Sequence, residues 1–129
     1  MTYLKLHSNN VRGLRQKQKR SSYFDWLKCI LKSNDGFILL QETHSTSEDE
    51  SLWESEFGSK IFFNHGTTAS CGVMIMPPKN QDFDIECLYR DAHGRIIVIK
   101  VENNDEHILI VNVYAPSSNE SDKLKFAHE

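Results

Sequence analysis

The sequence predicts a layered α/β domain, and two hydrophobic patterns support that prediction. In the first half, apolar runs of strand length alternate with segments of helical periodicity. From about residue 70 the period changes to two, and turn residues separate short apolar runs at hairpin spacing. The expected order is therefore strand, helix, strand, helix and then a meander of strands, with helices covering at least one sheet.

The first strand and the first helix follow from local signals. Residues 3–8 form a short segment with apolar positions on one face, and the glycine-containing residues 9–14 are expected to form a loop. Ser21 or Ser22 can cap a helix that runs to about Ser33, because the apolar residues there recur at the spacing of one helix face.

Later elements are predicted in the same way. Cys29 lies among the apolar positions of the first helix and is expected to be a buried thiol. Residues 37–40 are apolar throughout, which predicts a strand buried on both faces. Residues 46–57 predict a second helix, since Thr46 or Ser47 can cap it and acidic residues occupy its first turn. The remaining elements are expected to be strands at 60–63, 72–76, 83–89, 95–102 and 107–114 and a helix at 119–128.

Composition and charge limit the classes of function. The chain has 129 residues, of which 39% are hydrophobic and 26% charged, the balance of one globular domain. Because its net charge is −3, a nucleic acid must be contacted through a local patch, and the basic run at 12–20 is either that patch or a solvated loop. Three widely spaced cysteines do not fit a disulfide framework or a zinc site. With neither a membrane-length apolar run nor a signal peptide, an intracellular protein without membrane contact is expected.

Polar side chains follow three of the predicted strands. Asn10 follows the first strand, Glu42 the second, and Asn112 and Tyr114 lie at the end of the last. Ligands gather at strand ends in layered α/β folds, so these side chains are expected to meet on one rim of the sheet.

Glu42 admits two interpretations. Its carboxylate follows the buried strand at 37–40, where a charge is costly unless a cation or hydrogen bonds compensate for it. Mg²⁺ compensates with few protein ligands because it keeps several waters. The alternative is an exposed loop acid near the start of the following helix, and the residues alone leave both interpretations open.

Four motifs resemble a known superfamily in their order and spacing. They are NVRGL at 10–14, QETH at 41–44, GVMI at 72–75 and NVYAP at 112–116. Together they resemble the endonuclease/exonuclease/phosphatase superfamily, and most closely the apurinic-endonuclease-like domain of non-LTR (LINE-type) retrotransposons. The segment at 91–95, followed by an apolar strand, is also similar to that domain.

The resemblance implies metal-dependent hydrolysis of a phosphodiester in DNA. The residues that match Asn10 and Glu42 hold a divalent cation in that family, which implies Mg²⁺ here, with Mn²⁺ as an alternative. The residue that matches Tyr114 contacts the scissile phosphate. Glu42 and Tyr114 are thus the expected catalytic residues, and the expected substrate-binding residues are Arg12, Asn112 and Ser117.

Two departures from the family pattern affect this expectation. Ser117 stands where the family often has Asn, and the later Gly-Asp-Phe-Asn and Ser-Asp-His motifs do not occur within the 129 residues. Residues 1–129 are therefore expected to be the N-terminal portion of a single domain, part of a four-layer α/β/β/α sandwich with mixed, largely antiparallel sheets. The portion is expected to supply mainly one sheet with its helices, to be catalytically incomplete alone, and to self-associate through its uncovered sheet.

Two other functions remain alternatives. One is a non-catalytic module that binds nucleic acid or protein, and the other is a phosphatase of the same superfamily. The QETH and NVYAP motifs favour the nuclease by resemblance. A retained retrotransposon role would imply a nuclear location.

Overall fold

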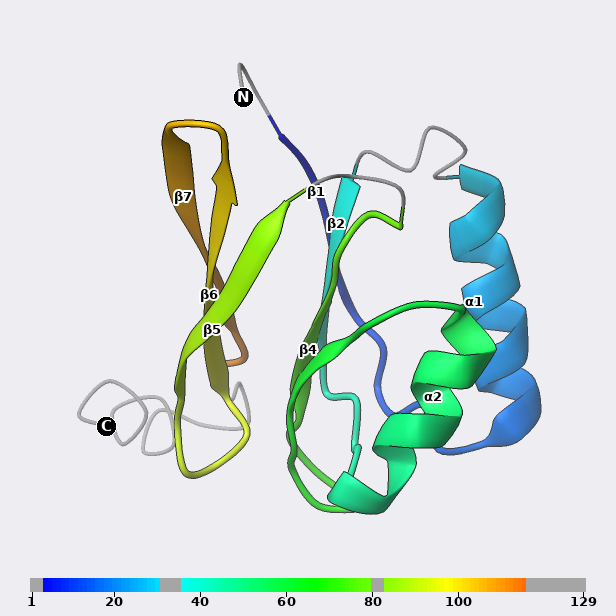
Figure 1. The fold of residues 1–129 in the computed structure, drawn as a ribbon. Coiled ribbons are helices and arrows are strands. Elements are labelled where there is room, and N and C mark those ends of the chain that lie inside the picture. The colour runs from blue at the N-terminus through cyan, green and yellow to red at the C-terminus, as the bar shows by residue number, and fades with distance from the viewer. Residues whose placement is uncertain (1–3, 31–35, 80–82, 116–129) are drawn as a thin grey trace.

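The computed structural model describes residues 4–30, 36–79 and 83–115, which form three layers (Figure 1). Two helices lie on one side, a first sheet lies in the middle, and a second sheet lies on the other side. In chain order the elements are β1 (Lys5–Asn10), α1 (Lys17–Ile30), β2 (Gly36–Gln41), the 3₁₀ helix η1 (Ser47–Asp49), α2 (Glu50–Phe57), β3 (Phe62–Asn64), β4 (Val73–Met76), β5 (Asp84–Arg90), β6 (Ile96–Asn103) and β7 (Glu106–Val113).

The two sheets have different topologies. The first sheet has the strand order β1-β2-β4-β3, in which β1 and β2 are parallel and α1 connects them. The second sheet is the antiparallel meander β5-β6-β7. The predicted order of elements and the mixed, largely antiparallel sheets are therefore confirmed.

Strand β2 is buried on both faces, as its uniformly apolar sequence predicted. Alternate side chains point to opposite faces of a strand. Ile38 and Leu40 belong to the core on the helix side, which also contains Trp53 of α2. Phe37 and Leu39 belong to the core between the two sheets. The first sheet thus forms the centre of two cores.

The core between the sheets corrects one expectation. Ile97, Ile99 and Ile110 of β6 and β7 are buried against the first sheet, so the chain supplies strands of both sheets rather than mainly one. The expectation of mainly one sheet was wrong because the period-two pattern of a strand does not reveal which sheet the strand joins. The uncovered apolar surface is instead the outer face of β5-β6-β7.

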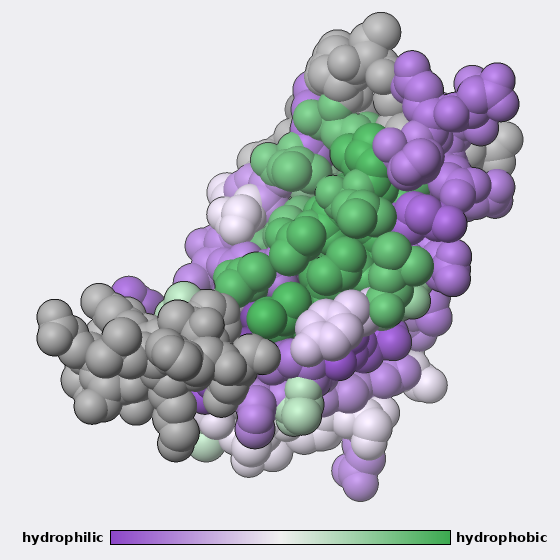
Figure 2. Space-filling view, turned by 90° about the vertical axis from the view of Figure 1, so that its left-hand side faces the viewer, coloured by the Kyte–Doolittle hydropathy of each residue, from purple (hydrophilic) through white to green (hydrophobic). Residues whose placement is uncertain are grey.

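That outer face carries a continuous apolar area, which Figure 2 shows from the side of the second sheet. Its side chains alternate along the strands with those buried in the core. The exposed large hydrophobic residues on these strands are Leu88, Tyr89, Leu109, Val111 and Val113.

The first helix differs from its prediction in start and in face. It begins at Lys17, where the Gln16 side chain accepts the N–H of Lys19 at 2.6 Å, so an amide and not a serine satisfies the first turn. Cys29 is exposed, and the expectation of a buried thiol was wrong. The predicted helix end at Ser33 lies outside the described residues, as does the predicted helix at 119–128.

Strand β1 also lies later in the chain than predicted. It continues through Asn10, so this residue belongs to the strand end and not to a loop. Leu6 is 57% exposed and does not face a core. Among the described residues, no helix combines the length and the apolar character that crossing a membrane requires.

Candidate metal and phosphate site

Backbone hydrogen bonds continue beyond the strand ends and hold several loops side by side at one rim. The segment 11–14 pairs with 41–43, and the segment 43–44 pairs with 71–72. The N–H of Gly72 donates to the carbonyl of Gly94 at 2.8 Å, and the N–H of Tyr114 donates to the carbonyl of Arg95 at 2.7 Å. Both sheets therefore contribute to one rim.

Asn10 and Glu42 are in direct contact at this rim. The Nδ2 of Asn10 donates a hydrogen bond to Oε2 of Glu42, and the Oδ1 of Asn10 accepts the backbone N–H of Arg12 at 3.1 Å. The Asn10 amide and the Glu42 carboxylate are thus in contact, and among the described residues no lysine or arginine is paired with that carboxylate.

Tyr114 shares the rim with Glu42. Partial burial, followed by the negative charges of Glu42 and Cys71, raises the pKa of the Tyr114 hydroxyl, although Arg95 acts in the opposite direction. A tyrosine is protonated at neutral pH even at its ordinary pKa, and a raised pKa preserves this state, so the hydroxyl is available there as a hydrogen-bond donor.

The backbone at the rim adopts left-handed conformations at residues other than glycine. Arg12, Glu42, His44 and Cys71 have φ values of 53°, 55°, 58° and 60°. Such residues are strained by about 1–2 kcal/mol each, and strained residues concentrate at functional sites. Gly72 allows the close approach of the loops, since a Cβ there would lie 2.4 Å from the hydroxyl oxygen of Thr43.

Asn112 is a structural residue and not a rim residue. Its side chain is 1% exposed, and its Nδ2 donates to the carbonyls of Leu40 and Met74, both at 2.9 Å. Its Oδ1 accepts a hydrogen bond from Gln41 at 2.8 Å. These bonds tie β7 to the first sheet and engage the amide that was expected to bind substrate.

The basic run at 12–20 does not form one phosphate-binding patch. Arg20 is buried and bonds to Glu56 and to the carbonyl of Leu14. Arg15 pairs with Asp49 at 2.5 Å. Arg12 remains exposed beside Asn10, while Ser117 lies outside the described residues.

The turn between β5 and β6 is organised by Asp91. Its Oδ1 accepts the backbone N–H groups of Arg95 and Ile96 at 2.8 and 2.9 Å, and its Oδ2 accepts that of His93. Burial raises the pKa of Asp91, but these bonds and one from Asn64 bring it below the ordinary value. The charged carboxylate thereby fixes the segment whose carbonyls hold Gly72 and Tyr114.

His65 is a polar residue near the rim that its sequence context did not single out. The Nδ1 of His65 lies 2.9 Å from Oγ of Ser45, and its Nε2 lies 2.6 Å from Oε2 of Glu50. These partners are 20 and 15 residues away, so no local pattern could have revealed the contacts.

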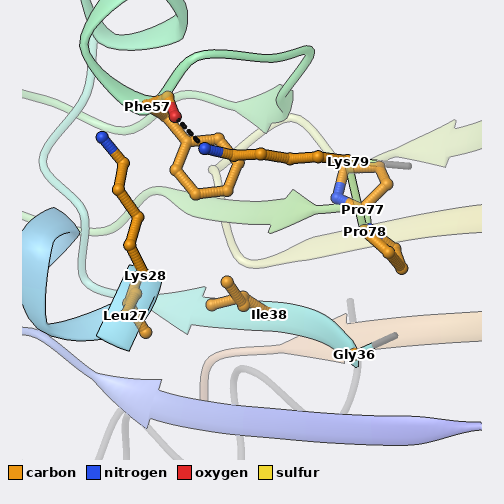
Figure 3. A pocket seen from close by; sticks show the side chains of 8 residues that line it. All are labelled: Leu27, Lys28, Gly36, Ile38, Phe57, Pro77, Pro78 and Lys79. Atoms are coloured by element: carbon orange, nitrogen blue, oxygen red, sulfur yellow. Dashed lines mark hydrogen bonds between the residues drawn. The ribbon is translucent and has the colours of Figure 1, made fainter. Parts of the chain in front are cut away.

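The described residues offer little room for an organic ligand in their apolar pocket and no cluster of acidic, histidine and cysteine side chains. A small apolar pocket lies between α1, β2 and the residues after β4, where Lys79 donates to the carbonyl of Phe57 (Figure 3). Its volume of about 20 Å³ is room for about one water, too little for an organic ligand. Among the described residues, no three His, Cys, Asp or Glu side chains gather to hold a metal ion.

Comparison with known proteins relates the chain to transposon proteins. It is 29% identical over 115 residues to "Transposon TX1 uncharacterized 149 kDa protein" of Xenopus laevis, covering 89% of this chain and 9% of that protein. It is similar in structure to "Endonuclease domain of TRAS1, a telomere-specific non-LTR retrotransposon", with a TM-score of 0.58 and 16% identity. That match covers 96% of this chain and 53% of the solved domain. No established protein-family profile matches the sequence.

These similarities confirm the resemblance predicted from the sequence. The structural neighbour is the endonuclease domain of a non-LTR retrotransposon, and the sequence relative is a transposon protein. The chain shares the layered fold of that domain but spans only about half of its length.

Proposed function

We propose that the chain forms the metal- and phosphate-binding part of a Mg²⁺-dependent DNA endonuclease domain of the retrotransposon type. The contact between Asn10 and Glu42 beside Tyr114 carries the proposal, because it joins an amide, a carboxylate and a phenol at one rim. The shared fold with a retrotransposon endonuclease domain supports it. Such a role on DNA implies a nuclear location.

The donor set suits a hard cation. Mg²⁺ prefers oxygen ligands and retains several waters, so one carboxylate and one amide suffice to hold it weakly. Glu42 keeps Oε1 for this purpose, and the Oδ1 of Asn10 keeps a second lone pair beside its bond to Arg12. When bound, the cation would polarise a phosphoryl oxygen and stabilise the oxygen that leaves; Mn²⁺ offers the same chemistry.

The remaining rim residues act on the phosphate itself. The protonated hydroxyl of Tyr114 would donate a hydrogen bond to a phosphate oxygen, where negative charge develops during the reaction. Arg12 is exposed and its backbone N–H bonds to Asn10, so its guanidinium would contact the DNA backbone close to the site. Ser117 remains a proposed substrate contact on its sequence position alone.

Mg²⁺ titration tests the site directly. Amide NMR shifts of Asn10 and Glu42 should respond to millimolar Mg²⁺ in the wild type, since a sparse ligand set gives weak affinity without phosphate. The response should disappear in Glu42→Ala and persist in Glu48→Ala, which removes an exposed carboxylate from the neighbouring 3₁₀ helix. An equal response in both variants would remove Glu42 from the site.

The 129-residue polypeptide alone is expected not to nick DNA. The motifs that supply the water-positioning and proton-transferring groups by resemblance do not occur in it, and proton transfer typically contributes about 10²–10⁴ of the rate. Relaxation of supercoiled plasmid and cleavage of an abasic-site duplex are the assays. Metal-dependent nicking that Glu42→Ala abolishes would contradict this expectation, whereas turnover of a small phosphate ester without nicking would favour the phosphatase.

A further inference from the structure

A chain of hydrogen bonds runs from the surface of α2 to the loop that carries Glu42. Glu50, half exposed on α2, contacts Nε2 of His65 at 2.6 Å. The Nδ1 of His65 lies 2.9 Å from Oγ of Ser45, which accepts a hydrogen bond from the hydroxyl of Thr43 at 3.1 Å. Ser45 and Thr43 are completely buried, and Thr43 follows Glu42 directly.

One assignment of donors and acceptors gives every group in this series of hydrogen bonds a partner. An ionised carboxylate only accepts, so Nε2 of His65 must carry the proton that Glu50 receives. With the proton on Nε2 and the ring neutral, Nδ1 is the acceptor to which the Ser45 hydroxyl donates in this assignment. This leaves the oxygen of Ser45 to accept from Thr43, so each group has a partner.

Ser45, His65 and Glu50 have the residue types of a nucleophilic triad, but their geometry excludes that role. The Ser45 hydroxyl is fully buried and already accepts from Thr43, so no substrate carbonyl can reach it. The role of these hydrogen bonds must therefore be to hold a part of the protein in place.

Thr43 is the residue on which the chain of hydrogen bonds ends. It lies between Glu42 and His44, whose φ values of 55° and 58° are both left-handed. Its backbone N–H reaches the carbonyl of Gly72 at 3.0 Å, and its hydroxyl lies where a side chain at position 72 would stand. Fixing Thr43 from both sides maintains the strained backbone that turns the Glu42 carboxylate toward Asn10.

We propose that His65 is a positioning residue for Glu42, acting through the hydroxyls of Ser45 and Thr43. Its Nδ1 supplies the one acceptor that the buried Ser45 hydroxyl requires, and Glu50 selects the tautomer that makes this acceptor available. The inference rests on the proposed function only for the role of Glu42 as metal ligand.

Three substitutions of His65 separate positioning from simple packing. His65→Asn places an amide oxygen near the former Nδ1 and keeps an acceptor for Ser45, whereas His65→Gln places its amide nitrogen near the former Nε2 and keeps only the donor to Glu50. His65→Phe removes both bonds but preserves the stacking on Phe63, whose ring centroid lies 5.1 Å away.

Hydrogen exchange of the Thr43 and His44 amides is the readout, with the Ile99 amide of β6 as internal reference for global stability. In His65→Gln and His65→Phe, both amides should exchange roughly five- to a hundredfold faster relative to Ile99, the effect of one unsatisfied buried hydroxyl. His65→Asn should remain closer to the wild type. If packing alone matters, His65→Phe will resemble the wild type and His65→Asn will not, which would overturn the proposal.

A second measurement needs no variant. The ¹⁵N shifts of the wild-type His65 ring should show a protonated Nε2 and an unprotonated Nδ1 at neutral pH, and the opposite tautomer would overturn the proposal. If the wild type shows no Mg²⁺ response but the His65 variants show the expected changes in hydrogen exchange, only the metal site is refuted. A Glu42-dependent Mg²⁺ response with unchanged Thr43 and His44 exchange would refute positioning alone.

Discussion

At the scale of single residues, the rim combines strain with uncompensated polarity. Glu42 and Arg12 occupy left-handed backbone, and the Nε2 of His44 is buried without a hydrogen-bond partner within the described structure. Each of these features costs stability, and none is needed to form the two cores. Their concentration beside the Asn10 contact indicates that the rim residues serve something other than folding.

Arg12→Gly is predicted to stabilise the chain. Glycine adopts the φ of 53° without the clash that an L-residue suffers, and the exposed Arg12 side chain contributes little packing. After the greater flexibility of glycine in the unfolded chain is subtracted, a gain of about 0.5–1 kcal/mol remains. Urea denaturation measures it.

Arg12→Ala is the matched control, because it removes the same charge but keeps the Cβ. It should show no gain, and equal stabilities of the two variants would mean that the backbone at residue 12 is not strained. If both variants bind DNA more weakly by the same amount, the cause is the loss of the Arg12 charge.

The rim residues differ in how far the sequence predicts them. Asn10, Glu42 and Tyr114 could be singled out because each lies at the end of a strand or directly after it, where ligands gather in layered α/β folds. Asn112 occupies the same kind of position but points into the core, since side chains alternate along β7. His65 was not identifiable, because its partners come from distant segments.

At the scale of elements, prediction succeeded where the hydrophobic period was unambiguous. Strands β2, β4, β6 and β7 were placed to within one or two residues because both their apolar pattern and their flanking turns were clear. The start of α1 was placed too late, because its first turn contains no apolar residue and Gln16 replaces the usual serine cap. Local signals therefore located elements better than their boundaries.

Asn112→Ala is predicted to destabilise the chain by roughly 2–4 kcal/mol. The substitution removes the buried amide donor that bonds to the carbonyls of Leu40 and Met74, and it removes one of the three acceptors of the Gln41 amide. Thermal or urea denaturation would show the loss. His107→Ala, on an exposed position of the same strand, should stay within about 0.5 kcal/mol of the wild type. A small effect of Asn112→Ala on stability would return the residue to the list of substrate contacts.

At the scale of the whole molecule, three layers pack against one another and one apolar sheet face is exposed. Helices α1 and α2 cover the first sheet on one side, and the second sheet covers it on the other. No described element covers the outer face of β5-β6-β7. The sequence could not indicate this arrangement, because assigning strands to sheets requires long-range pairing.

The chain is predicted to self-associate through the outer face of β5-β6-β7. Leu109 and Val111 are 55% and 51% exposed there, and complete burial of such a side chain contributes about 1.5–3 kcal/mol. An apolar area of this kind favours association with a second copy.

Size-exclusion chromatography and sedimentation should show an apparent mass that rises with concentration. Leu109→Lys should shift the equilibrium toward the monomer, because association would then bury an unpaired ammonium. Leu52→Lys is the matched control, since Leu52 is 53% exposed on α2 and should leave association unchanged. A wild-type chain that stays monomeric at all concentrations and melts sharply and reversibly well above about 45 °C would show that the open face needs no cover.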